Sequence, residues 1–98
     1  MTSDVSWDEL KDFSNFLKHG VSFEQAGAPF SLGTDFLEIF DEAHSCEEDR
    51  FIALGPIAGG IVFVVWLEPE ENMIRIVSAR WANKRERAHF QRFMEEQR

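Results

Sequence analysis

The chain has 98 residues, a formal net charge of −8 and 44% hydrophobic residues. This length fits a single domain spanning residues 1–98, the apolar content excludes global disorder, and no run of about 18 apolar residues predicts a membrane span. The single Cys excludes an internal disulfide framework. Because the acidic N-terminus also lacks the features of a signal peptide, we expect a cytoplasmic protein that does not bind membranes.

Charge is distributed unevenly along the chain. Residues 1–49 contain 12 acidic and 2 basic residues, whereas residues 50–98 contain 6 acidic and 8 basic ones. Five of the basic residues fall between Arg75 and Arg87. Because the planar guanidinium group fits phosphate oxygens, this cluster suggests an anion site, either for RNA phosphate or for an acidic protein partner.

The N-terminal third is predicted to be mainly helical. A short strand at Val5–Trp7 precedes a helix that the Ser6-x-x-Glu9 capping box opens and Gly20 ends. In this helix, apolar and polar residues form separate stripes at helical spacing, Leu10, Phe13 and Leu17 in one and Lys11, Asn15 and Lys18 in the other. A second short helix starts at Ser22, where Ser22-x-x-Gln25 repeats the capping pattern; it buries Phe23, Ala26 and Phe30, and Pro29 limits its length.

From residue 36 the periodicity becomes strand-like. The predicted strands are Phe36–Phe40, Phe51–Leu54, Gly60–Leu67 and Met73–Ala82, and the run IVFVVWL is apolar enough for a central strand. Short connections favour an antiparallel meander, after which Asn83-x-x-Glu86 caps a last helix with Phe90, Phe93 and Met94 on one side. The expected fold is α+β, an antiparallel sheet of four to five strands with N-terminal helices and one C-terminal helix.

Three stretches together match a known pattern. The first runs from Trp7 to Ala26 as W-D-x-x-K-x-x-x-N-x-x-K-H-G-V-S-F-E-x-A. The second is D-x-x-H-S-x-x-E-x-R from Asp41 to Arg50, with His44, Ser45 and Glu48 at its other matched positions. The third is I-R-I-V-S-A-R-x-A-x-x-x-E-R from Ile74 to Arg87. In these stretches the chain resembles the BrnT family of toxins from bacterial type II toxin–antitoxin modules.

The resemblance implies a fold like that of RelE-type ribonucleases and RNA cleavage that inhibits translation. It also implies a cognate antitoxin, BrnA-like and of the ribbon-helix-helix class, with operator DNA bound only through the toxin–antitoxin complex. No cofactor is implied. Because the His and Cys spacings match no standard ligand pair, we expect no metal site. The chain contains no Tyr, so tyrosine-based proton transfer is excluded.

Metal-independent RNA cleavage needs a base, cations that stabilise charge on the phosphate, and an acid. The predicted catalytic residues are His19 and Lys18, with Arg50 and Arg80. His19 titrates nearest neutral pH and lies at a helix C-terminus, where it could instead cap the last carbonyls. Lys18 would hold a phosphate, although a lone surface lysine is more often solvated.

Further residues are predicted to bind substrate. These are Lys11, Glu24, Ser78, Arg75 and Arg87. Strict strand alternation would put Arg75 and Arg80 on opposite faces unless a bulge intervenes, with Arg50 from a neighbouring strand as the partner of Arg80. Each assignment has a structural alternative: ion pairing with Glu47–Asp49 for Arg50, close packing for Ser78, and a favourable helix dipole for Glu24.

Two other functions remain open from the sequence. One is a non-catalytic module, a degenerate toxin that binds the antitoxin or acts as a co-repressor, which the strong acidity motivates. The other is an acidic scaffold whose arginine cluster binds an acidic protein. Growth arrest on induction would separate an active toxin from both.

Overall fold

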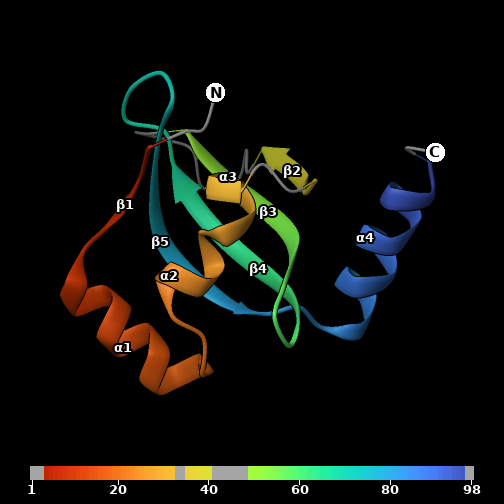
Figure 1. Ribbon diagram of the computed structural model, residues 1–98, viewed down its shortest axis with the longest axis horizontal. Helices are drawn as coiled ribbons and strands as arrows, with labels where there is room; N and C mark the ends of the chain where they lie inside the picture. The colour runs from red at the N-terminus through yellow and green to blue at the C-terminus, as the bar shows by residue number, and fades with distance from the viewer. Residues whose placement is uncertain (1–3, 33–34, 41–48, 97–98) are drawn as a thin grey trace.

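The computed structural model describes residues 4–32, 35–40 and 49–96, and it confirms an α+β fold (Figure 1). Chain order gives β1 (Asp4–Trp7), α1 (Glu9–His19), α2 (Phe23–Ala26), α3 (Ala28–Leu32), β2 (Leu37–Phe40), β3 (Arg50–Ile57), β4 (Gly60–Leu67), β5 (Met73–Trp81) and α4 (Lys84–Glu96). The five strands form one sheet in the order β1-β5-β4-β3-β2. The predicted residues Asp41, His44, Ser45 and Glu48 lie outside the described ranges.

The sheet is antiparallel except at one edge. Strands β2 to β5 pair as the predicted antiparallel meander, and the apolar run in β4 lies between β3 and β5. Strand β1, however, pairs in parallel with β5, from Asp4↔Met73 to Trp7↔Ile76. A parallel pair needs a long connection, which here comprises every element between these two strands. The sheet is therefore mixed, with β1 closing only half of the edge of β5.

Strand β3 continues three residues beyond its predicted end at Leu54. It runs to Ile57, which pairs with Gly60 across a tight turn where Gly59 has a φ of 100°. The Gly55-Pro56 pair does not break the strand because β2 stops pairing at Leu54. Pro56 therefore sits on an edge, where no neighbouring strand needs its missing N–H group.

The main core lies between the sheet and the short helices α2 and α3, which lie across the sheet in Figure 1. Phe23 and Ala26 are fully buried there, and the ring of Phe30 meets that of Trp66 edge-on at 5.6 Å. A smaller cluster forms on the opposite face of the sheet, where Phe90 of α4 packs with Leu54. The central strands are thus covered on both faces, the second only in part.

Helix ends follow short-range signals with two corrections. Helix α1 is capped by Asp8, whose Oδ1 accepts from the N–H groups of Leu10 (2.8 Å) and Lys11 (3.2 Å). The predicted Ser6 cap is wrong because Ser6 lies in β1, paired with Arg75. The single helix predicted from Ser22 is two, α2 and α3, with Pro29 in the first turn of α3, where its missing N–H is tolerated.

Three predicted end signals are confirmed. Gly20 ends α1 in the left-handed conformation, with φ 73°, and its N–H donates to Phe16 at 2.8 Å. The Ser22–Gln25 capping box is present at α2. Asn83 and Glu86 form the predicted reciprocal pair at α4, with hydrogen bonds of 2.9 and 2.8 Å.

Helix α1 has its polar side toward the sheet. Asn15 is its one buried residue, at 8% exposure, whereas the large apolar side chains of α1 face solvent. An amphipathic helix normally buries its apolar stripe. The reversal here places the polar stripe predicted at Lys11, Asn15 and Lys18 against β5.

Candidate functional site

The site is built on the contact between α1 and the outer edge of β5. Beyond Ile76, β1 no longer pairs with β5. Asn15 replaces it: its Nδ2 donates to the carbonyl oxygen of Ala79 at 2.8 Å, and its Oδ1 accepts from the N–H of Ala79 at 3.1 Å. The side-chain amide thus stands in for one residue of a neighbouring strand. Nδ2 also donates to the carbonyl of Val21 at 3.1 Å, which fixes the end of α1.

A bulge in β5 lies at the same place. Val65 and Trp66 of β4 are consecutive, yet they pair with Ser78 and Ile76, so Val77 is an extra residue in β5. A bulge shifts which residues face each side of the strand. Val77 and Ser78 are consequently presented at the edge beneath α1.

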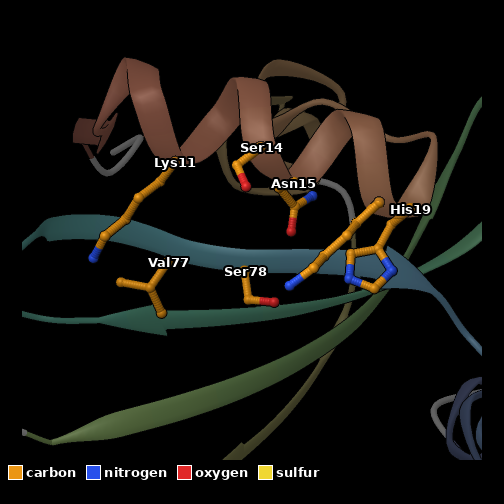
Figure 2. Close-up of a pocket in the computed structure, with 7 residues that line it drawn as sticks. Lys11, Ser14, Asn15, His19, Val77 and Ser78 are labelled. Atoms are coloured by element: carbon orange, nitrogen blue, oxygen red, sulfur yellow. The ribbon is translucent and has the colours of Figure 1, made fainter.

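Side chains from both elements surround a cavity of about 290 Å³. Its lining is Lys11, Ser14, Asn15, Lys18, His19, Val77 and Ser78, and it includes no carboxylate. Figure 2 shows Lys11 and His19 extending from α1 toward β5, on the side where Val77 and Ser78 project. The cavity therefore combines two ammonium groups, an imidazole and two hydroxyls.

The basic side chains of this cavity have no internal partner within the described ranges. There, the side chains of Lys11, Lys18 and His19 make no hydrogen bond or ion pair. His19 is exposed in the last turn of α1, whose C-cap hydrogen bond comes from Gly20, so the imidazole is not used as the cap. Clustered cations near a hydroxyl and without acids suit an external anion such as a phosphate.

Arg75 and Arg80 lie on the same face of β5, because the bulge intervenes between them. Their partners on β4 are Leu67 and Phe63, four residues apart on one strand and therefore on one face. Ser78 pairs with Val65, which lies between these two, and so shares that face. Arg75, Ser78 and Arg80 thus form one row, with Ser78 reaching the cavity.

Arg80 is engaged by α4. Its Nη1 and Nη2 donate to Oε1 and Oε2 of Glu86 at 2.8 and 2.9 Å, and its guanidinium carbon lies 3.9 Å from the centre of the Phe63 ring. The hydrogen bonds from Arg80 lower the pKa of Glu86, and those same bonds raise the pKa of Arg80. This bidentate pair holds the first turn of α4 against β5.

Arg50 lies nearer to Arg75 than to its predicted partner. Both Arg50 and Arg75 pair in register with Leu67, from either side, so two strand spacings separate them, about 10 Å. Arg80 pairs instead with Phe63, which lies four residues from Leu67 along β4, a distance of about 13 Å. The structure therefore brings Arg50 and Arg75 together on one face and does not place Arg50 beside Arg80.

The remaining predicted residues lie elsewhere. Glu24 is exposed in the first turn of α2, outside the lining of the cavity. Nη1 of Arg87 donates to the carbonyl of Ala82 at 2.8 Å, and Arg87 lines a second cavity, of about 350 Å³, beside Phe90 of α4. Within the described residues there is no group of three or more potential metal ligands, and no described helix is long and apolar enough to cross a membrane.

Three lining residues, Ser14, Asn15 and Val77, were not predicted as site residues, although Asn15 stood in the predicted polar stripe of the helix. Ser14 stands on the polar side of α1, three residues after Lys11 and four before Lys18, so helical spacing alone could have identified it. Val77 lines the cavity because of the bulge, for which the local sequence gives no signal.

Comparison with known proteins identifies the family. A model described as the ribonuclease toxin BrnT of type II toxin–antitoxin systems matches residues 7–86. The chain belongs to the BrnT family. The 1.1 Å crystal structure of the Brucella abortus ribonuclease toxin BrnT is similar, with a TM-score of 0.67 and 27% identity over 85% of this chain and 100% of that one. No curated protein matches the chain. Membership of this family supports ribonuclease activity and implies an antitoxin partner.

Proposed function

We propose that the chain is an endoribonuclease toxin that cleaves RNA by metal-independent phosphoryl transfer in the cavity between α1 and β5. The observation that carries this proposal is the group of three cationic or titratable side chains, Lys11, Lys18 and His19, that no described acid neutralises. Beside them stands the hydroxyl of Ser78. Such a set matches the needs of RNA cleavage, namely proton transfer and charge stabilisation.

The chemistry follows from these groups. Neutral His19 takes the proton from a ribose 2′-OH, whose oxygen attacks the adjacent phosphorus, and the bond from phosphorus to the 5′-oxygen breaks. The leaving 5′-oxygen takes a proton from a cationic acid, a role that fits Lys18. Lys11 and the Ser78 hydroxyl hold the non-bridging oxygens as negative charge grows on them. The products are a 2′,3′-cyclic phosphate and a free 5′-hydroxyl.

The arginines of the sheet extend this site. Arg75 is exposed and shares its face with Ser78, so it can hold the next phosphate of the RNA, and Arg50 lies beyond it across Leu67. Both Nη atoms of Arg80 donate hydrogen bonds to Glu86, so the guanidinium can bind RNA only by sharing these two nitrogens between Glu86 and the RNA. Its contribution to cleavage is then indirect: Arg80 helps to position Ser78, which lies two residues before it on β5.

In the cell, cleavage would inhibit translation in the cytoplasm. A BrnA-like antitoxin of the ribbon-helix-helix class would neutralise the toxin, and the complex would bind operator DNA through the antitoxin. These roles rest on membership of the toxin–antitoxin family.

The proposal is tested with purified protein and an RNA substrate in the presence of EDTA. His19→Ala is expected to lower the cleavage rate by about 100-fold or more, since general acid–base groups contribute that much. Lys18→Ala should also slow cleavage, and Arg92→Ala, which removes an exposed cation from α4 outside the cavity, should cleave at the wild-type rate. Cleavage by His19→Ala at the wild-type rate, or no cleavage by wild type, would refute it.

A second candidate is a non-catalytic antitoxin-binding module. The net charge of −8 opposes general affinity for RNA, and large apolar side chains on α1 face solvent as they would in a binding surface. Growth arrest on induction without the antitoxin distinguishes the two, because only an active toxin causes it.

A further inference from the structure

The outer side of α1 is an apolar surface, here called the α1 stripe: Leu10, Phe13, Phe16 and Leu17. Their exposed fractions are 82%, 65%, 50% and 70%. With about 200 Å² for a fully exposed large side chain, these exposed fractions leave roughly 500 Å² of apolar surface on the stripe. Patches of that size on a monomer often mark a binding site.

The fold itself does not use this surface. Asn15, on the opposite side of α1, attaches the helix to Ala79 and Val21, and Asp12 accepts the N–H of Phe23 at 2.8 Å. Polar contacts therefore set the orientation of α1, at the cost of leaving four large apolar side chains in water. Because apolar burial is the main driving force of association, such an orientation is explained by a partner that covers the stripe.

Charges on the two sides of the stripe indicate the chemistry of that partner. At 100° per residue, Glu9 lies between Phe13 and Phe16, and Asp12 borders Phe16. Phe23 donates its N–H to Asp12. Glu24, the next residue, therefore lies beside this acidic side. The other side carries the cations of the cavity. A complementary segment has an apolar stripe, basic residues along one side of it and acidic residues along the other.

We propose that the cognate antitoxin places an amphipathic helix with this charge pattern on the α1 stripe. A second copy of the chain fits less well, because residues 1–49 alone carry 12 acidic and 2 basic residues and two such halves repel each other. A standard interface buries about 800 Å² on each partner, and the stripe supplies more than half of that as its apolar centre.

This placement also gives a mechanism of neutralisation, and that part rests on the proposed function. The stripe and the cavity occupy neighbouring sides of the same helix, with Lys18 on the side between them. A helix about 10 Å wide that lies along the stripe reaches the mouth of the cavity, and its acidic side faces Lys11 and Lys18. RNA and the antitoxin then exclude each other.

The test compares Phe13→Asp and Leu17→Asp with Ala58→Asp, which adds the same charge to the exposed β3–β4 turn. The probe is the purified product of the reading frame adjacent to the gene of this chain. By calorimetry, each stripe variant should raise Kd by about 30-fold or more, as a charge at the centre of an interface does, and Ala58→Asp should change it by less than about twofold. Cleavage of RNA by the free variants and their thermal midpoints should remain those of wild type.

Hydrogen exchange on the wild-type complex gives a second measurement that needs no variant. Slower exchange in residues 9–19 on binding supports the proposal, and unchanged exchange there overturns it, as do wild-type affinities for both stripe variants. A wild-type dimer that Phe13→Asp dissociates without loss of antitoxin affinity would assign the stripe to a second copy. If wild type cleaves no RNA while the stripe variants lose affinity, the proposed function fails and the docking surface stands.

Discussion

Replacing Asn15 by Ala should test how α1 is attached to the sheet. The change removes all three hydrogen bonds of the Asn15 amide, two to Ala79 and one to Val21. Ala79 and Val21 are fully buried, so their backbone groups have no immediate access to water when the amide is absent. The effect should therefore exceed that of losing three hydrogen bonds on the surface.

The magnitude follows from these groups. Each lost hydrogen bond costs about 1 kcal/mol, and buried groups left unpaired add to this. Alanine returns about 0.5 kcal/mol through its higher helix propensity. The free energy of unfolding should fall by about 3 kcal/mol, a large share of the ~5–15 kcal/mol typical of a domain. Asn15→Asp, which keeps the shape but loses the donor, should cost at least as much at neutral pH because its carboxylate faces two carbonyl oxygens.

Urea unfolding followed by Trp fluorescence measures the effect. With a slope of about 1.5 kcal/mol per M, Asn15→Ala should lower the midpoint by about 2 M. Ser14→Ala, on the same helix but exposed, is the matched control and should change stability by less than about 0.5 kcal/mol. A midpoint for Asn15→Ala within about 0.3 M of wild type would show that the amide does not hold the helix.

Two further predictions concern carboxylates with shifted pKa values. Arg80 lowers the pKa of Glu86 below its usual 4.5, so its stabilisation is present above that pH and is lost as pH falls through the folded value. Glu86→Gln should thus cost about 1 kcal/mol at pH 7 and progressively less as pH falls below 4.5, and an equal loss at pH 7 and pH 3 would contradict this. Burial, with help from Glu68, raises the pKa of Glu38 above 4.5, so its ionisation weakens the fold as pH rises past that value. Because Glu38 is exposed, solvent screens this effect. Glu38→Gln should raise the thermal midpoint at pH 7 by less than about 2 °C and leave it unchanged at pH 3, whereas a lower midpoint at pH 7 would refute the assignment.

Local signals predicted much of the fold. The left-handed Gly20, the Ser22 capping box and the Asn83–Glu86 pair all act within four residues, and the structure has each of them. The apolar run of β4 likewise predicts a central strand because both of its faces must be covered. These features depend on the chain near them and on little else.

The features that the sequence did not predict depend on distant contacts. The parallel pairing of β1 joins Val5 to Ile74, and nothing near either residue specifies the partner or its direction. The bulge at Val77 is defined only against β4. The orientation of α1 is set by Asn15 and Ala79, which are 64 residues apart. Hydrophobic periodicity shows that α1 has two sides but not which of them faces the protein.

The candidate site divides in the same way. Lys18 and His19 are adjacent in one matched stretch, so their common position in the cavity follows from a single helix. The position of Arg50 nearer to Arg75 than to Arg80, with Leu67 between them, follows from the register of three strands, which periodicity does not supply. Arg80 pairs with Glu86 in the first turn of α4. The sequence shows Glu86 only as the capping partner of Asn83 and not as the partner of Arg80.

The amide of Asn15 also restricts how other chains can bind. An open strand edge is a template to which a peptide or a second sheet can add by β-augmentation, and such edges promote aggregation. At Ala79 that template is occupied, because both backbone groups that an incoming strand would use are already bonded to Asn15. Extension of the sheet from this part of β5 is therefore blocked by one side chain, and an incoming strand there would first have to displace α1.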